Sequence, residues 1–324
     1  MPTHPAPWSV AIFTARESIS TLGGCVNAAL AACAGREATV DILVNGNRAL
    51  ADETAQLVAS IAPPPGVAAR VWFIALGDKA HTWNEYVYRI SKEGSLAFFV
   101  DGYAEVRPDA FRLIEEALAV NSEALAVSGV PTSGRTAAAL RAHMLQEGGI
   151  HGNLYALCPS AMQDLRKSEF RLPLGLYRTD PMMGAVLMYR FDPAKYKWDA
   201  KAIFVHPDAT WDVRRGPVWT LSNMLVLWRR KLRQAQGDLE NRAVREHLSI
   251  QKRAPREIPA TTRELVGNWI SSRRAQARSM MVLNPLAFYA ANKLKNQERD
   301  WSGAATAPDL LATSALTQPA ARMA

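Results

Sequence analysis

The segment Phe98-Phe-Val-Asp-Gly-Tyr-Ala-Glu-Val-Arg-Pro-Asp-Ala110 decides the fold class of this 324-residue chain. It continues an apolar run, Leu96 to Val100, of the kind that forms a strand buried on both faces of a sheet. Asp101 ends the run, and Pro108 stands near the first turn of a predicted helix over 108–120. A buried strand that leads through a polar turn into a helix is the repeating unit of a parallel α/β sheet.

The same alternation of strands and helices extends back to the N-terminus. We predict strands at 9–14, 40–44, 69–76 and 96–100, and helices at 18–34, 50–61, 83–92 and 108–120. Continuous apolar strands indicate a mostly parallel sheet with helices on both faces. Ligands bind such sheets at the carboxyl ends of the strands, so the residues that follow each strand are the candidates for a site.

Beyond residue 120 the alternation weakens. The apolar segments predict strands at 124–130, 153–158 and 202–206, a helix at 180–189, and mainly helical structure over 217–300. The final stretch is rich in Ala, Thr and Pro. We expect it to be a disordered tail over 301–324.

The composition is that of a globular protein, with 48% hydrophobic and 21% charged residues. None of the three cysteines stands in a C-x-x-C pair, which favours a reduced, cytosolic protein. The N-terminus lacks the basic and apolar regions of a signal peptide, and no apolar run reaches the ~18–20 residues that a bilayer requires. We therefore expect a cytoplasmic protein, either free or peripheral on the inner face of the cell membrane.

The net charge of +8 is concentrated near the C-terminus. Residues 214–299 hold 18 Lys and Arg against 6 Asp and Glu, a local charge of +12 that leaves −4 for the remainder. A helix that carries Trp beside Lys and Arg can lie in a membrane interface, but it can equally pack on the protein with its charges in water. We predict attachment to an anionic membrane, or docking of an acidic partner, through Trp219, Trp228 and Arg229 to Arg233.

Several enzyme and binding classes lack their motifs. The first strand is not followed by G-x-G-x-x-G, and the chain has no G-x-x-x-x-G-K-[ST], H-E-x-x-H or G-x-S-x-G. No zinc-finger, RNP-type or helix–turn–helix pattern is present either. Dinucleotide oxidoreductases and P-loop enzymes are thus disfavoured, and we expect no nucleic-acid partner.

Three segments in order resemble the family 2 glycosyltransferases of GT-A fold. Ser9 to Arg16 is similar to their first strand and loop, Asp41 to Asn47 to their second strand, and Phe98 to Ala110 to their fourth strand with its D-x-D motif. The resemblance runs through about residues 8–212. It implies a glycosyltransferase domain over 1–215, with a nucleotide-binding half at about 8–120 and an acceptor half at about 121–215, followed by a basic helical region over 216–300.

The resemblance implies an inverting transferase that moves a sugar from a nucleotide-diphosphate sugar to a glycan or lipid-linked acceptor, in polysaccharide biosynthesis of the cell envelope. The residues implied at the donor are Thr14, Arg16, Asn45, Lys79, Asn84, Asp101 and Tyr103. Gly152 and Asn153 fall in the implied acceptor loop, and Asp180 is the implied general base. Alternatively, Asp180 caps a helix that begins at Pro181, and Lys79 is an exposed lysine at a helix start.

The D-x-D motif departs from the family pattern, because Tyr103 stands where the second carboxylate is usual. A divalent Mg²⁺ or Mn²⁺ ion would then depend on Asp101 together with His206 or Asp212. Asn45 and Thr179 also replace residues that the family normally uses. These departures leave open a second hypothesis, a non-catalytic relative that binds a glycan or a partner enzyme.

Overall fold

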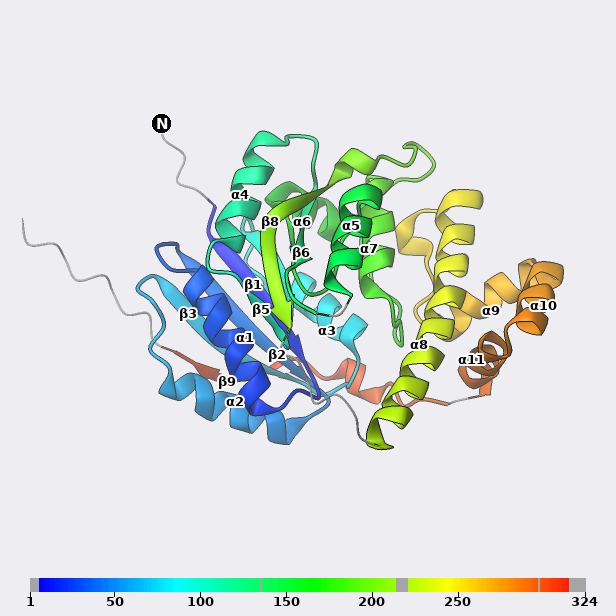
Figure 1. Ribbon diagram of the computed structural model, residues 1–324. Helices are drawn as coiled ribbons and strands as arrows, with labels where there is room; N and C mark the ends of the chain where they lie inside the picture. Colours follow the sequence, from blue (N-terminus) through cyan, green and yellow to red (C-terminus); the bar gives the residue numbers. More distant parts are fainter. Residues whose placement is uncertain (1–5, 135, 214–220, 297, 315–324) are drawn as a thin grey trace, which may run out of the picture.

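The computed structural model describes residues 6–134, 136–213, 221–296 and 298–314. These residues form one mixed sheet with the strand order β5-β8-β6-β7-β4-β1-β2-β3-β9. Helices cover both faces of the sheet, and a group of further helices stands beside it (Figure 1). The expected fold class, a mostly parallel α/β sheet with helices on both faces, is confirmed.

The centre of the sheet consists of parallel strands. They are β1 (Trp8–Thr14), β2 (Ala38–Asn45), β3 (Val67–Ile74) and β4 (Leu96–Asp101). All seven residues of β1 are buried, as the continuous apolar runs of the sequence predict. Because the strands are parallel, Thr14, Asn45 and Asp101 all arrive at the same edge of the sheet.

The remaining strands extend the sheet on both sides. They are β5 (Ala104–Val106), β6 (Ala126–Pro131), β7 (Tyr155–Leu157), β8 (Ile203–Val213) and β9 (Asp309–Thr313). β7 lies antiparallel between β4 and β6. β8 runs parallel to β6 with an irregularity after Ser128, and it reaches Val213, well beyond the predicted end at 206.

Among the described residues, seven α-helices precede the C-terminal region. They are α1 (Ile19–Ala32), α2 (Arg48–Ser60), α3 (Lys79–Glu85), α4 (Ala110–Val120), α5 (Ala137–Glu147), α6 (Pro159–Lys167) and α7 (Thr179–Met188). A π-helical turn over Tyr86–Ile90 continues α3. Side chains of α1, α2 and α4 form one core cluster with one face of the sheet, and side chains of α3, α6 and α7 form a second cluster with the other face.

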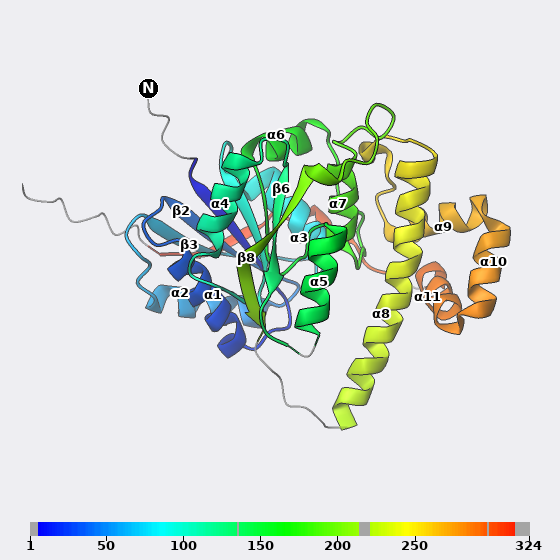
Figure 2. The ribbon, with the colours of Figure 1, turned by 45° about the horizontal axis from the view of Figure 1, so that its top comes forward.

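The C-terminal region is helical. It consists of α8 (Leu221–Arg245), α9 (Thr262–Ser272), α10 (Arg274–Leu283) and α11 (Pro285–Asn296). Leu239 of α8 and Trp269 of α9 are buried in the same core cluster as Phe99 of β4 and Leu176. In Figure 2, α9, α10 and α11 lie on the side of α8 that faces away from the sheet. None of the described helices is both long and apolar enough to cross a membrane.

The expected disordered tail is wrong for residues 302–314. Ser302–Ala305 form a short 3₁₀ helix, and β9 pairs antiparallel with β3, with Thr313 opposite Arg70. Without β9, β3 would be an edge strand with unpaired backbone groups, so the tail gains ladder hydrogen bonds that a local pattern cannot reveal. Residues 315–324, Trp219 and the expected boundary at 215–216 lie outside the described residues.

Candidate functional site

A cleft of about 2160 Å³ opens at the carboxyl ends of the central strands. The loops after β1, β2 and β4 form one side, and the segment before α7 together with α8 and α11 forms another. The sequence-predicted residues that line it are Thr14, Arg16, Asn45, Lys79, Asp101, Tyr103, Asn153 and Asp180. Topology therefore brings together side chains that are up to 166 positions apart in the sequence.

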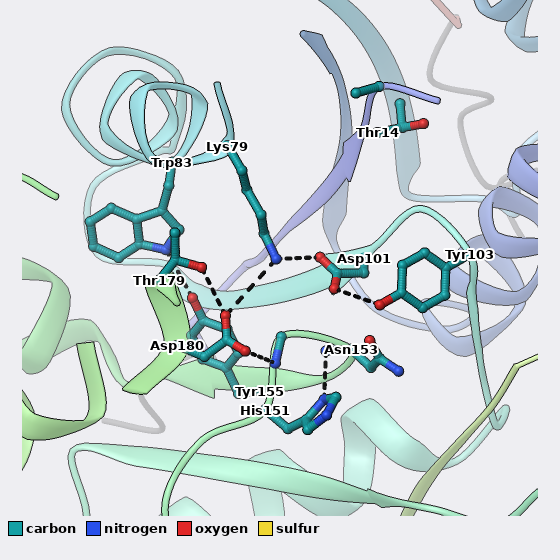
Figure 3. A network of polar contacts seen from close by, with 12 residues as sticks. Thr14, Lys79, Trp83, Asp101, Tyr103, His151, Asn153, Tyr155, Thr179 and Asp180 are labelled. Atoms are coloured by element: carbon teal, nitrogen blue, oxygen red, sulfur yellow. Dashed lines mark hydrogen bonds and ion pairs between the residues drawn. The ribbon is translucent and has the colours of Figure 1, made fainter. Parts of the chain in front are cut away.

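Lys79 lies at the centre of the polar network in this cleft (Figure 3). Its Nζ is 2.5 Å from Asp101 Oδ1 and 3.9 Å from Asp180 Oδ1. Lys79 is the first residue of α3, whose start is fixed by Asp78, since the Asp78 carboxylate accepts a hydrogen bond from the His81 N–H. A helix start at the end of β3 thus delivers an ammonium group between two carboxylates.

Asp101 ends β4, and both of its carboxylate oxygens have partners. Oδ1 pairs with Lys79, and Oδ2 accepts a hydrogen bond from the Tyr103 hydroxyl at 3.2 Å. Burial raises the pKa of Asp101 more than the Lys79 ammonium lowers it. Burial and the neighbouring Asp101 also raise the pKa of Tyr103, so its phenol stays protonated and donates. Tyr103, which replaces the second carboxylate of the motif, is thus hydrogen-bonded to the first, Asp101.

Asp180 is held in its ionised form. Burial acts to raise the pKa of this carboxyl, but Lys79, His151 and hydrogen bonds from Thr179 and from the Gly152 N–H together hold it below the usual value. The two hydrogen bonds measure 2.8 Å from Thr179 Oγ1 and 2.9 Å from the Gly152 N–H. Because burial lowers the pKa of His151, that ring is neutral at neutral pH, and Lys79 supplies the positive charge.

The alternative of a capping role for Asp180 has little support in this geometry. α7 begins at Thr179, so Asp180 is already its second residue. An N-cap side chain accepts hydrogen bonds from its own helix, whereas the donor that Asp180 takes from the backbone is Gly152, on another loop. The position in the first turn does stabilise a negative charge, because the positive end of the helix dipole lies there.

Gly152 allows this close approach. A Cβ atom at position 152 would lie 3.0 Å from both carboxylate oxygens of Asp180 and 3.0 Å from Lys79 Nζ. A side chain at this position would press on the Asp180 carboxylate and the Lys79 ammonium, so the glycine suits this close contact. The neighbouring Asn153 is buried, and its Oδ1 has no hydrogen-bond partner among the described residues. Asn153 lines the cleft, and a buried oxygen without a partner is unusual in a folded protein.

Two residues of the site were not predicted from the sequence. The His151 ring stacks on Trp211 with a centroid distance of 5.1 Å, and its Nδ1 accepts a hydrogen bond from the Asn153 N–H. Glu17 organises the loop after β1, because its carboxylate accepts hydrogen bonds from Thr14 Oγ1 and from the N–H groups of Ala15 and Arg16. His151 is the neighbour of Gly152 in the sequence, and that adjacency was the available signal.

Asn84 does not line the cleft, contrary to the prediction of a donor contact. Its side-chain amide donates to the Leu172 carbonyl and accepts from the Leu172 N–H, both at 2.9 Å. The π-helical turn that follows α3 and the buried position of Asn84 direct the side chain toward the segment that leads to α7. Its role in this geometry is to tie that segment to α3.

The predicted metal ligands are not assembled. His206 Nδ1 accepts from the N–H groups of Asp208 and Ala209, and the Asp212 carboxylate accepts from Thr132 and lies 3.7 Å from Arg107. Neither residue lines the cleft with Asp101. Within the described ranges, no three His, Cys, Asp or Glu side chains are grouped so that they could hold a metal ion.

Both carboxylate oxygens of Asp101 are engaged by side chains of this chain. Mg²⁺ and Mn²⁺ require several oxygen ligands, but here one oxygen of Asp101 faces an ammonium and the other a phenol. The structure does not bring the expected partners, His206 or Asp212, to Asp101. Lys79 occupies the position beside the carboxylate, and the irregular part of β8 directs His206 into a local turn.

No family model matches this chain, and no curated protein sequence matches it. Its structure is similar to that of a mannosyltransferase from Pyrobaculum calidifontis, solved in complex with GDP-Man and Mn²⁺, with a TM-score of 0.53 and 14% sequence identity over 92% of this chain and 89% of that one. A glucosyl-3-phosphoglycerate synthase from Mycobacterium tuberculosis, solved with Mn²⁺, UDP-glucose and phosphoglyceric acid, matches with a TM-score of 0.47 and 13% identity over 74% and 79% of the two chains. The likeness to the mannosyltransferase extends over nearly all of both chains, and the fold of this chain is thus that of a GT-A-type glycosyltransferase.

Proposed function

We propose that this chain is a glycosyltransferase that transfers a sugar from a nucleoside-diphosphate donor to an acceptor hydroxyl with inversion of the anomeric centre. One observation carries the proposal: an ionised Asp180 and the ammonium of Lys79 face each other in a cleft at the strand ends of a GT-A-type fold. The mannosyltransferase of similar fold was solved with a nucleotide sugar. The family 2 resemblance of the first, second and fourth strands supports the same activity.

The donor would lie along the ends of β1, β2 and β4. The loops there are tightly packed, since a Cβ on Gly102 would lie 2.8 Å from Thr14 Cβ. Asn45 Nδ2 donates to the Thr14 carbonyl at 2.9 Å and so joins two of these strand ends. Lys79 would meet the negative charge of the diphosphate, and Thr14, Arg16 and Tyr103 would contact the nucleotide.

In the transfer step the acceptor hydroxyl oxygen forms a bond to the anomeric carbon on the face opposite the leaving group. The bond between that carbon and the diphosphate oxygen breaks, and its electron pair leaves with the nucleoside diphosphate. Asp180 takes the hydroxyl proton as general base. Lys79 stabilises the charge that develops on the leaving diphosphate.

We propose that Lys79, rather than a divalent cation, supplies this positive charge. The ammonium already contacts Asp101, the single carboxylate left in the motif. Chelation with EDTA is then expected to leave transfer within about 2-fold of its rate, and Mn²⁺ is expected to change nucleotide affinity by less than about 2-fold. A rate that falls to background with EDTA and returns with Mn²⁺ would contradict a role for Lys79 in place of the ion.

A nucleotide screen tests the proposed function. Binding of UDP, GDP and dTDP to the full chain is measured by thermal shift, and turnover of the matching nucleotide sugars by release of the diphosphate. At least one nucleotide should raise Tm, and Asp180→Asn should keep this binding but lose turnover. Binding without turnover in the wild type, left unchanged by Asp180→Asn, would instead favour the non-catalytic relative. Failure of every nucleotide to bind would contradict the proposed transferase.

We propose further that the chain associates with an anionic membrane through the surface of α10 and α11. Residues 265–297 contain five Lys and Arg and no Asp or Glu. Val282 and Leu283 are 81% and 83% exposed at the end of α10, and Phe288 is 59% exposed on α11. Arg273 pairs with Glu246, but Arg274 and Arg278 on α10 form no ion pair with a described carboxylate. Apolar side chains beside such cations fit the interface of an anionic bilayer, and a lipid-linked acceptor of the cell envelope would be presented there.

The proposed surface on α10 and α11 differs from the one predicted from the sequence, which consisted of Trp219, Trp228 and Arg229 to Arg233. Trp228 is exposed on α8, but Trp219 lies outside the described residues. Co-sedimentation of the full chain with vesicles that contain phosphatidylglycerol should be strong at low salt, weaker at about 0.5 M salt, and lost in Arg274→Glu/Leu283→Ser. Arg112→Gln on α4, remote from this surface, is the matched control. Equal sedimentation of the double variant and the wild type would contradict the proposal.

A further inference from the structure

A second cavity, of about 560 Å³, lies between α8, α11 and the loop that follows β1. Arg16, Arg233 and Lys293 line it together with Gln236 and Tyr289, and none of its lining residues is acidic. The cations come from three separate elements, so they surround the space rather than form a run along one helix. A concave surface with positive charge on several sides attracts an anion.

The cations of this cavity are not neutralised by the described part of the chain. Arg16, Arg233 and Lys293 form no ion pair with a described carboxylate, whereas the nearby Arg178 pairs with Asp238 and Arg299 with Asp78. The three side chains are exposed, and the Arg233 guanidinium lies 5.8 Å from the ring centroid of Tyr177. Accessible and uncompensated cations can take up a ligand without breaking an existing pair.

One face of α8 ties the cavity to the segment that carries Asp180. Arg233, Gln236 and Glu240 follow at helical spacing and therefore share a face. Gln236 Nε2 donates to Glu240 Oε1 at 2.8 Å, and the Glu240 carboxylate accepts the N–H groups of Tyr177 and Arg178 at 3.0 Å each. Residues 177 and 178 lead directly into α7 and Asp180, so the cavity is fixed relative to the proposed base.

The cavity also joins the large cleft. Arg16, Arg233, Gln236 and Lys293 line both spaces, and the cleft contains Asp180 and Lys79. A ligand held by the cations could thus extend into the cleft. Six of the seven residues that line the cavity belong to α8 and α11, and Arg16 alone comes from the nucleotide-binding strand ends. This lining favours the acceptor over the base and ribose of the donor as the ligand of the cavity.

We propose that this cavity binds a phosphate or diphosphate group of the acceptor and so directs the acceptor hydroxyl toward Asp180. The inference rests on the proposed function and names its acceptor class. A phosphate offers three acceptor oxygens in a pyramid, which suits cations that approach from three elements. Arginine binds such groups in a bidentate manner, and lysine adds a point charge. A soluble phosphorylated molecule and a lipid-linked phosphate present the same group.

Two probes separate the two sources. The full chain, saturated with the nucleoside diphosphate that it binds, is titrated with glycerol 3-phosphate in one arm and with vesicles containing phosphatidic acid in the other. Arg233→Gln/Lys293→Gln should weaken binding of at least one probe by about 10-fold or more, because each substitution removes a charge-assisted hydrogen bond. Arg242→Gln, an exposed arginine on the opposite side of α8, should change the affinity by less than about 2-fold.

The outcomes distinguish this inference from the proposed function. Binding of neither probe by a chain that binds nucleotides overturns the inference alone. Equal binding by the double variant and the wild type, with unchanged Tm, also overturns it, because the cations would then not hold the phosphate. A probe that displaces the nucleoside diphosphate occupies the donor site and overturns the assignment to the acceptor. A chain that binds no nucleoside diphosphate loses the proposed function and this inference together.

Discussion

Replacing Lys79 by methionine should move the acid limb of the pH–rate profile to higher pH. The substitution keeps an unbranched side chain, one atom shorter, but removes the ammonium that lies 3.9 Å from Asp180 Oδ1. Burial raises the pKa of the Asp180 carboxyl, and Lys79 is the first of the groups that oppose this effect. A general base works only when it is deprotonated. The wild type should therefore stay active to a lower pH than Lys79→Met.

The size of the effect follows from the distance between the two charges. Two unit charges 3.9 Å apart interact with about 1 kcal/mol in bulk water and about 4 kcal/mol at the effective dielectric of a protein surface. The side chains of Lys79 and Asp180 are 33% and 26% exposed, so the interaction falls between these limits. At about 1.4 kcal/mol per factor of ten, the proton concentration at half-maximal activity should change by between about 5-fold and about 1000-fold.

The assay is kcat/KM for the nucleotide sugar that the chain turns over, measured from about pH 4 to about pH 9. Each profile is normalised to its own plateau, so that a loss of donor affinity in Lys79→Met does not hide the position of the limb. Lys293→Met is the matched control, because Lys293 lines the same cleft but does not act on Asp180. Acid limbs that coincide in the wild type and Lys79→Met would refute the reasoning.

Three further changes test other parts of the site. Asp180→Asn should lower kcat by about 10²–10⁴-fold, while the nucleotide affinity measured by calorimetry stays unchanged. Asp52→Asn, at an exposed residue of α2, should change neither quantity. Equal rates in the two variants would show that Asp180 is not the base. Gly152→Ala places a Cβ 3.0 Å from Asp180 and Lys79. We expect kcat/KM to fall by about 10-fold or more, while Tm stays within a few degrees. An unaffected rate would show that the close contact of Gly152 with Asp180 is not needed. Burial raises the pKa of Glu240 from 4.5 to about 7, so the folded state holds this proton more tightly and its stability falls as pH rises through that window. Between pH about 5 and about 8, the free energy of unfolding in urea should fall by roughly 3 kcal/mol more in the wild type than in Glu240→Gln. Equal losses in the two proteins would contradict the raised pKa of Glu240.

The central sheet could be predicted because its signal is local. Each of β1 to β4 is a mostly apolar run, and β1, β2 and β4 end in a polar residue. The predicted strands match the observed ones to within two residues at each end. The strand-end residues Thr14, Asn45 and Asp101 could be placed at one edge for the same reason, since parallel strands present their carboxyl ends together.

Elements with weak or non-local signals were missed. β9 has mostly exposed side chains and exists because β3 offers an unpaired edge 235 or more residues earlier in the chain. α5 buries only Ala137 and Met144, so its sequence lacks an apolar face. β5 has three residues, too few for a period to be recognised.

Within the site, the order of strands and helices along the chain predicted which residues could lie near the cleft. It did not predict where their side chains point. Lys79 and Asn84 both belong to α3, yet the helix turns one toward Asp101 and the other toward Leu172. His206 lies in the irregular part of β8, and such an irregularity depends on the pairing with β6. The expected proximity of His206 to Asp101 was missed at this level, because the local turn at His206 engages its Nδ1.

The C-terminal helices are part of the site rather than an appendage to it. Their buried residues Leu239 and Trp269 share one core cluster with Phe99 of the central sheet, and Glu240 holds the backbone that leads into Asp180. The excess positive charge of the sequence is therefore presented in two places. Arg233 and Lys293 face the cleft, while the α10 arginines Arg274 and Arg278 are exposed to solvent. If both surfaces are used as proposed, one helical unit brings the protein to an anionic bilayer and also selects an acceptor that carries the same kind of charge.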